Sequence, residues 1–393
     1  MPSFTFRMNA RGDPLKRKFI PVSHPVFAGN EKKYVNECLD DVWISSAGEF
    51  IGAFESAFAR FCGVTEAISC NNGTAALHLA LQALGVSPGD EVIVPTLTYI
   101  ATANAVRYCN ATPVFVDSEP RTMNVDPAGI EARITPRTRG IIVVHLFGHP
   151  VDMNPILNLA SRRGLFVLED AAESHGALYL GAKTGALGTA ATFSFFGNKI
   201  ITTGEGGMVT TCDKELAGKM RLLRGQGMDP QRRYWFPIVG NNFRMTNIEA
   251  ALGLAQLEKI DYHLETRRKI ASWYGRHLVP LQDRLELPTE EPWARHSYWI
   301  YSILLKNGGS SDRDKLMRQL AMAGIETRPV FYPMHVMPPY LERLGSYPVA
   351  ESCSGRGILL PTHGLLEEED VAYIAQILSE SCLRSQKQAA GCR

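Results

Sequence analysis

The stretch SFFGNKIITTGEGG, residues Ser194–Gly207, places a single lysine between an apolar strand and a glycine-rich turn. Residues 190–196 are small, β-branched or aromatic and predict a strand, and residues 206–211 predict its partner strand. Lys199 then lies in the connection between the two strands. A lysine held away from water loses part of its preference for the charged form and can act as a nucleophile or a base.

A lone lysine on a hairpin is usually solvated, but two other segments favour a chemical role for Lys199. Residues 165–169 predict an apolar strand that leads into Asp170, and strand ends in α/β folds face the ligand crevice. Residues 69–80, SCNNGTAALHLA, form a small polar turn that opens into a helical pattern, as in phosphate-binding helix N-termini. A phosphate site, a carboxylate and a lysine are the groups that pyridoxal phosphate (PLP) requires.

Six ordered segments resemble the nucleotide-sugar aminotransferases built on the aspartate aminotransferase fold. The segments are Trp43–Ile51, Asn72–His78, Glu91–Tyr99, Ser194–Gly207, Asn242–Asn247 and Gly324–His335. The resemblance extends from about Ile20 to about Ile377 and is greatest to the family members that form GDP-perosamine. It implies an α/β fold, the PLP-dependent transferase fold of type I. That fold has a large domain, whose mixed, mostly parallel sheet is flanked by helices, and a smaller C-terminal α+β domain.

By this resemblance, Lys199 and Asp170 are the catalytic residues. Lys199 would bind the cofactor through its amine and then, once released, carry a proton between the substrate carbon and the cofactor. Asp170 would pair with the pyridine nitrogen and keep it protonated. Tyr99 would stack on the ring, although a tyrosine that packs behind the first helix of the sheet is the alternative. The phosphate would be held by the Ser194 hydroxyl and the backbone amides of Gly73, Thr74 and Ala75.

Two further cofactor contacts are implied by the resemblance. Asn242 stands where family members place an asparagine that completes the phosphate site of the neighbouring subunit, so a homodimer with shared active sites is expected. Glu173 stands where many members carry glutamine near the ring hydroxyl. For Glu173, a solvated acid at a helix start, stabilised by the helix dipole, is the alternative.

Three residues are candidate substrate contacts. Arg328 precedes a proline that restricts the backbone, and its guanidinium matches carboxylate and phosphate geometry. His335 belongs to the segment Tyr332–His335 and is the histidine that we expect at the sugar. Trp43 opens the first of the six similar segments.

The implied reaction is transfer of an amino group from L-glutamate to C4 of GDP-4-keto-6-deoxymannose, for the biosynthesis of a surface polysaccharide such as an O-antigen of lipopolysaccharide. The cofactor would pass through its pyridoxamine 5'-phosphate form. Three alternatives remain open: a dTDP-linked or UDP-linked keto-sugar, an 8-oxo-octulosonate, and a non-catalytic binding or regulatory protein that retains the fold. Related sugar 3-dehydratases carry histidine at the lysine position, so Lys199 favours transamination.

Composition adds constraints on partners and location. The 41 basic and 40 acidic residues give a net charge of +1, which provides no global attraction to nucleic acid. The eight cysteines show no zinc-type spacing, so no metal is expected. We find no signal-peptide pattern and no apolar segment of membrane-spanning length, and we expect a cytoplasmic protein without membrane contacts.

Strand-like and helical patterns alternate from residue 65 to residue 169, which predicts a largely parallel sheet with helices on both faces. A continuous helical pattern over residues 248–274 predicts a bridge out of the large domain. The predicted divisions are an N-terminal extension at 1–18, a large PLP-binding domain at 19–260, a small C-terminal domain at 261–383 and a tail at 384–393.

Overall fold

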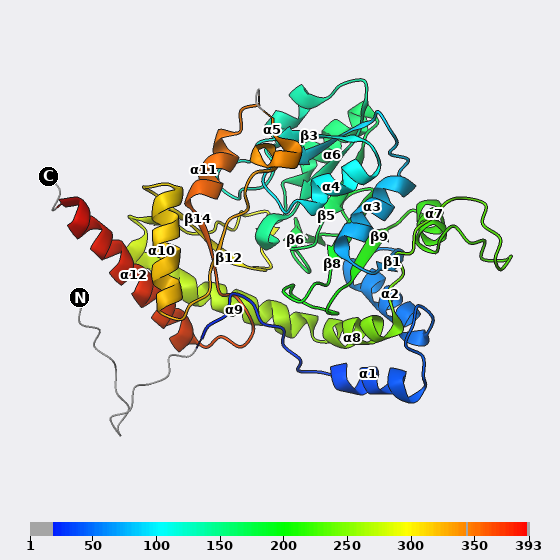
Figure 1. Ribbon diagram of the computed structural model, residues 1–393, viewed down its shortest axis with the longest axis horizontal. Coiled ribbons are helices and arrows are strands. Elements are labelled where there is room, and N and C mark those ends of the chain that lie inside the picture. The colour runs from blue at the N-terminus through cyan, green and yellow to red at the C-terminus, as the bar shows by residue number, and fades with distance from the viewer. Residues whose placement is uncertain (1–18, 343–344, 391–393) are drawn as a thin grey trace.

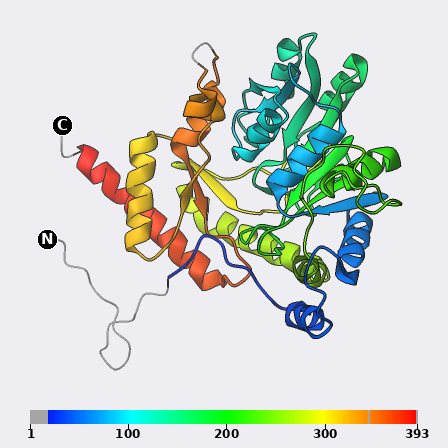
Figure 2. The same ribbon diagram turned by 45° about the vertical axis from the view of Figure 1, so that its right-hand side comes forward.

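A computed structural model describes residues 19–342 and 345–390 (Figure 1). The predicted N-terminal extension, residues 1–18, lies outside the described residues. The N-terminal two thirds of the chain build a seven-stranded sheet, and the C-terminal third builds a second, four-stranded sheet beside it (Figures 1 and 2).

The seven-stranded sheet is mixed and mostly parallel, as predicted. Its strands, in spatial order, are β1 (Glu66–Cys70), β9 (Gly207–Thr211), β8 (Ala190–Ser194), β5 (Phe166–Asp170), β4 (Thr138–Val144), β2 (Glu91–Pro95) and β3 (Thr112–Val116). Strand β9 is antiparallel to β1 and β8, whereas β8, β5, β4, β2 and β3 are parallel to one another. The β8–β9 pair confirms the predicted hairpin around Lys199.

Helices cover both faces of this sheet because successive strand residues point to opposite sides. Val94 on β2 enters one core with the helix that follows β1, and Ile93 enters another core with Ile156 of the helix that follows β4. The helices of this part are α1 (Glu31–Asp40), α2 (Glu49–Cys62), α3 (Gly73–Ala83), α4 (Ala101–Tyr108), α5 (Pro127–Ile130), α6 (Met153–Arg163), α7 (Lys214–Arg224) and α8 (Asn247–Leu257).

The four-stranded sheet is antiparallel and has its own core. Its strands, in order, are β10 (Leu285–Glu286), β12 (Tyr301–Leu305), β14 (Gly357–Leu360) and β13 (Arg328–Pro329). The helices of this part are α9 (Ile260–Leu278), α10 (Ser310–Met322), α11 (Pro348–Arg356) and α12 (Glu368–Ala390). Ile303 and Ile358 of the sheet share a core with residues of α9, α10 and α12. A small sheet of β11 (Ala294–Arg295), β6 (Leu178–Tyr179) and β7 (Ala182–Lys183) joins the two parts of the chain.

Two sequence predictions need correction. The continuous helix expected over 248–274 is two helices, α8 and α9, separated at Glu258–Lys259. The apolar periodicity continues across this break, so it carried no sign of the interruption. Helix α12 runs to Ala390, so the first residues of the predicted tail are helical. The predicted domain boundary after residue 260 falls at the start of α9 and stays a prediction.

Within residues 19–342 and 345–390, none of the helices combines the length and the apolar character that crossing a bilayer requires. Over the same part of the chain, no group of three or more His, Cys, Asp or Glu side chains is placed to hold a metal ion.

Candidate active site

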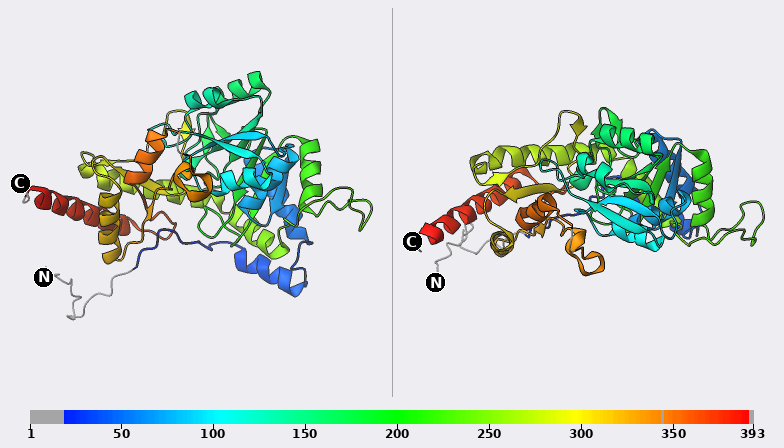
Figure 3. Two further views of the ribbon diagram at one scale, coloured as in Figure 1. Left: turned by 45° about the horizontal axis from the view of Figure 1, so that its top comes forward. Right: turned by 90° about the horizontal axis from the view of Figure 1, so that it is seen from above.

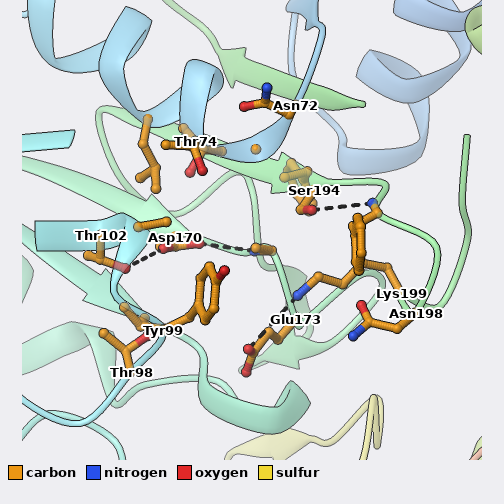
Figure 4. A pocket seen from close by; sticks show the side chains of 18 of the residues that line it. Asn72, Thr74, Thr98, Tyr99, Thr102, Asp170, Glu173, Ser194, Asn198 and Lys199 are labelled. Atoms are coloured by element: carbon orange, nitrogen blue, oxygen red, sulfur yellow. Dashed lines mark hydrogen bonds and ion pairs between the residues drawn. The ribbon is translucent and has the colours of Figure 1, made fainter. Parts of the chain in front are cut away.

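A cavity of about 660 Å³ opens at the carboxyl ends of β4, β5 and β8. Parallel strands bring these ends to one edge of the sheet, so residues far apart in the sequence meet there. Asp170, Glu173, Lys199 and Tyr99 turn toward this common space (Figure 4). Arg328, from the four-stranded sheet, also lines the cavity.

Lys199 lies in the connection between β8 and β9, and its side chain is largely buried. Its backbone N–H donates to the carbonyl of Phe196 over 2.9 Å, which tightens the turn that carries it. The side chain is 12% exposed, and its Nζ lies 3.9 Å from a carboxylate oxygen of Glu173. Burial lowers the pKa of the Lys199 amine, while the negative charges of Glu173 and Asp170 oppose that change.

Asp170 ends β5 and faces the cavity. Its carboxylate accepts hydrogen bonds from the Thr102 hydroxyl at 2.8 Å and from the Ala172 amide at 3.3 Å. Burial raises the pKa of Asp170, and the hydrogen bond from Thr102 is the main opposing influence. Strand alternation points the preceding residue, Glu169, to the opposite face.

Glu169 is fully buried and anchors the end of β5. Its two carboxylate oxygens accept hydrogen bonds from three backbone amides of the turn after β7, those of Gly185, Leu187 and Gly188. His145 Nε2 lies 3.0 Å from Glu169, and its Nδ1 accepts the Val151 amide, so Nε2 carries the hydrogen and donates to Glu169. These bonds fix the strand residue next to Asp170.

Glu173 lies within the cavity, 3% exposed, so the alternative of a solvated acid is wrong. Its carboxylate accepts the Phe147 amide at 2.8 Å on the side away from Lys199. Burial raises the pKa of Glu173 to about 7, against the attraction of the Lys199 charge. The amine and this carboxyl group therefore form a closely spaced acid–base pair.

The N-terminus of α3 meets the end of β8 at close range. A Cβ on Gly73 would lie 2.8 Å from Ser194 Cβ, so only glycine allows this approach. The Asn72 side chain caps the helix by accepting the Ala75 amide at 2.8 Å. Of the three amides predicted to hold phosphate, that of Ala75 is thus already engaged, whereas those of Gly73 and Thr74 begin the helix and have no acceptor within it.

Tyr99 is 60% exposed and lines the cavity, with its ring centroid 6.1 Å from that of Phe331. The alternative of a tyrosine packed behind a helix is therefore not what the structure shows. Figure 4 shows its ring between Asp170 and Glu173, in the space that Lys199 also faces.

Three predicted site residues do not line this cavity. His335 is buried, with its ring nitrogens 2.7 Å from the Thr96 hydroxyl and 3.0 Å from Glu351, so local hydrogen bonds use both nitrogens. Trp43 is 57% exposed and lines a separate acidic hollow. Asn242 is exposed and accepts a hydrogen bond from Arg244 at 3.0 Å.

Sequence patterns missed Thr102, Asn198 and Trp299, all of which line the cavity. Thr102 lies on the face of α4 that meets Asp170, and a threonine in an apolar helix carries no distinctive signal. Trp299 lies just before β12, separated from it by Ile300, and its sequence pattern is that of a core residue. Asn198 stands next to Lys199, inside the segment that the sequence pointed to, but its type alone indicated no role.

The groups present fit PLP on their own chemistry. A buried amine, a buried carboxylate on the neighbouring strand and a close-packed helix N-terminus border one cavity. Residues 26–379 match the sequence model that defines the DegT/DnrJ/EryC1/StrS aminotransferase family. The chain belongs to this family.

Known members of the DegT/DnrJ/EryC1/StrS family are similar over nearly their whole length. GDP-perosamine synthase of Caulobacter vibrioides is 58% identical, covering 92% of this chain and 98% of its own, and that of Escherichia coli O157:H7 is 50% identical with the same coverage. The solved structure of Helicobacter pylori PseC, an aminotransferase of pseudoaminic acid biosynthesis, superposes with a TM-score of 0.89 at 29% identity, covering 93% of this chain and 99% of PseC.

A Streptococcus pneumoniae protein solved in its PLP form superposes with a TM-score of 0.88 at 27% identity, covering 93% of this chain and 99% of its own. The fold is that of the PLP-dependent sugar aminotransferases. The chain is therefore a PLP-dependent aminotransferase of the DegT/DnrJ/EryC1/StrS family.

The raised pKa of Glu173 predicts a pH-dependent stability. In the unfolded chain this carboxyl group ionises near its ordinary value of 4.5, whereas in the folded chain it ionises near 7. Folded protein therefore binds the proton more tightly, and stability falls as pH rises through this window. Relative to Glu173→Gln, the cofactor-free wild type should lose roughly 1–3 kcal/mol of stability between about pH 4.5 and about pH 7.5.

The measurement is chemical denaturation of both cofactor-free proteins across this pH range. The glutamine variant is the matched control, because it keeps the shape and the acceptor oxygen without the titration. A stability difference that does not change with pH would contradict the ionisation assigned to Glu173.

Proposed function

We propose that this chain transfers an amino group from L-glutamate to C4 of GDP-4-keto-6-deoxymannose, a nucleotide-linked keto-sugar. The observation that carries the aminotransferase chemistry is the convergence of Lys199, Asp170 and Glu173 in one cavity. The choice of sugar is supported by the names of the relatives at 58% and 50% identity. The aminated sugar would then enter the biosynthesis of a surface polysaccharide, of which an O-antigen is one kind.

Bound PLP supplies an aldehyde that accepts the amino group and a pyridine ring that takes up the electrons released when a C–H bond breaks. Lys199 holds the reacting proton at Nζ and delivers it to the next carbon. The neighbouring carboxyl of Glu173, with an ionisation near neutral pH, accepts or returns a proton to this amine. Asp170, facing the cavity, keeps a protonated ring nitrogen charged.

We assign phosphate binding to the backbone amides of Gly73 and Thr74 and to the Ser194 hydroxyl. The Ser194 oxygen accepts the Phe196 amide at 3.3 Å, so its hydroxyl hydrogen is available for an anion. The positive end of the α3 dipole adds to this attraction. Tyr99 lines one side of the cavity and would stack on the cofactor ring.

Arg328 is the candidate substrate contact that the cavity supports. Its guanidinium belongs to β13 in the four-stranded sheet and lies 3.7 Å from Glu326, which leaves it only loosely paired. A carboxylate of the amino donor or a phosphate of the nucleotide is the anion that this group would bind. Trp43 and His335 do not border the cavity, so the proposal does not rely on them.

We also propose that the active form is a homodimer in which Asn242 of each protomer completes the phosphate site of the other. The segment between α7 and α8 projects far from the rest of the protomer (Figure 3). Its exposed residues include Tyr234, Trp235, Phe236 and Val239, and Val239 is 95% exposed. Large apolar side chains gathered on a projecting segment are typical of an interface. Asn242 lies shortly after Val239, beyond Gly240 and Asn241, and is itself exposed.

The test of the reaction is incorporation of nitrogen from L-glutamate labelled with nitrogen-15. Purified protein, PLP, labelled glutamate and GDP-4-keto-6-deoxymannose should yield a sugar with the label on C4, identified by mass spectrometry and NMR. The matched control substrates are the dTDP-linked and UDP-linked 4-keto-6-deoxy-sugars at the same concentration, for which we expect much lower kcat/KM. Preferred turnover of either control would contradict the assignment to a GDP-linked sugar, and no labelling of any sugar would contradict the reaction.

Mixing of two inactive variants tests the shared site. Lys199→Ala removes the reactive amine, and Asn242→Ala weakens phosphate binding in the partner, so neither homodimer should be active at limiting PLP. A mixed dimer contains one site with both Lys199 and Asn242 intact. Co-expression of the two variants should therefore restore activity, whereas co-expression that restores nothing would contradict the intersubunit role of Asn242.

A further inference from the structure

Trp299 contacts the lysine segment at two points, although it lies 100 residues further along the chain. Its indole Nε1 donates to the backbone carbonyl of Asn198 over 2.7 Å, directly before Lys199. The Lys199 Nζ lies over the same indole, 4.1 Å from the ring centroid. One side chain therefore contacts both the backbone and the tip of the lysine.

The indole itself is fixed in place. Trp299 is buried, and its ring stacks on Phe147 with centroids 6.5 Å apart and an interplanar angle of 23°. The buried Arg267 donates to the Trp299 backbone carbonyl at 2.6 Å. The Ser23 hydroxyl, from the N-terminal part of the chain, also donates to the Asn198 carbonyl, over 3.2 Å. The backbone next to Lys199 is therefore held by two hydrogen bonds, from Trp299 and from Ser23.

Two carboxylates act on the charge of the Lys199 amine, and two further charged residues, Glu205 and Arg328, line the same cavity. Loss of water opposes the ammonium form, while Glu173 and Asp170 favour it. Burial lowers the pKa of His175 to about 3 and keeps it neutral, so it adds no charge. An aromatic face within about 6 Å attracts a cation without offering a competing base. Trp299 therefore adds a stabilising contact, and its ring face offers no basic site that could take the proton.

We propose that Trp299 is a positioning residue that holds the free ammonium of Lys199 against its ring face. The inference deepens the proposed function, because a lysine that carries a proton must exist as an ammonium during part of each cycle. In that step a C–H bond breaks and an N–H bond forms at Nζ; the proton later returns to a second carbon, and the amine ends unchanged. Trp299 stabilises the protonated stage and keeps the Nζ near Glu173.

The test alters the ring's electrons without altering its shape. Fluorine withdraws electron density from the indole face, so fluorotryptophan should attract the ammonium less and lower the pKa of Lys199. The full chain, cleared of cofactor, is prepared with tryptophan, monofluorotryptophan or difluorotryptophan. The rate of acetylation of Lys199 by acetic anhydride is then followed against pH by mass spectrometry. We expect the apparent pKa of Lys199 to fall in steps, by about 0.3 to 1 pH unit in total.

The matched control is Trp299→Phe with the same fluorotryptophans at the remaining tryptophan positions. Its Lys199 pKa should not respond to fluorine, because none of the other tryptophans lines the cavity that holds the amine. Melting temperatures of all proteins establish that the fold is retained. An unchanged pKa in the fluorinated wild type, or an equal fall in the control, would overturn the role of Trp299. Neither sugar nor glutamate takes part, so a failure of the proposed reaction would appear separately, in the labelling of the sugar.

Discussion

Burial of the Lys199 amine beside two buried carboxyl groups is the constraint on which the rest of the structure depends. Loss of water lowers the pKa of the amine and raises those of Asp170 and Glu173. The attraction between the amine and each carboxylate changes these pKa values in the opposite direction. The raised pKa of Glu173, about 7, allows this carboxyl group to exchange a proton with the Lys199 amine near neutral pH. Ionisable groups buried together are stable only when each has a suitable partner at a fixed distance.

The sheet supplies that fixed geometry. Asp170 ends one parallel strand and Lys199 follows the next, so the two side chains meet at the same edge. Behind them, the carboxylate of Glu169 binds three backbone amides and His145 on the far side of β5. Removing one partner of a buried charged group costs far more than its net contribution, so this anchor resists displacement of β5. Because Asp170 is the next residue, the bonds of Glu169 also hold the backbone of Asp170 in place.

The sequence predicted those parts of the molecule that local patterns encode. The predicted strand 165–169 differs from β5 by one residue at each end, because an apolar run between polar turns marks a buried strand. Lys199 and Asp170 were found in the same way, from strand ends and turns. Trp299 could not be found, since its contact with Lys199 depends on how the two parts of the chain meet. For His335, the residue type was evident from the sequence, but the two neighbours that contact its ring nitrogens were not.

The absorbance spectrum of the purified protein tests the central claim, that the Lys199 amine is the group through which the chain binds and uses PLP. PLP is added first and L-glutamate second, to the wild type and to Lys199→Ala. The account predicts a band of lysine-linked cofactor in the wild type only, which glutamate converts to the pyridoxamine phosphate spectrum. The same band in Lys199→Ala, or a wild-type band that glutamate leaves unchanged, would contradict it.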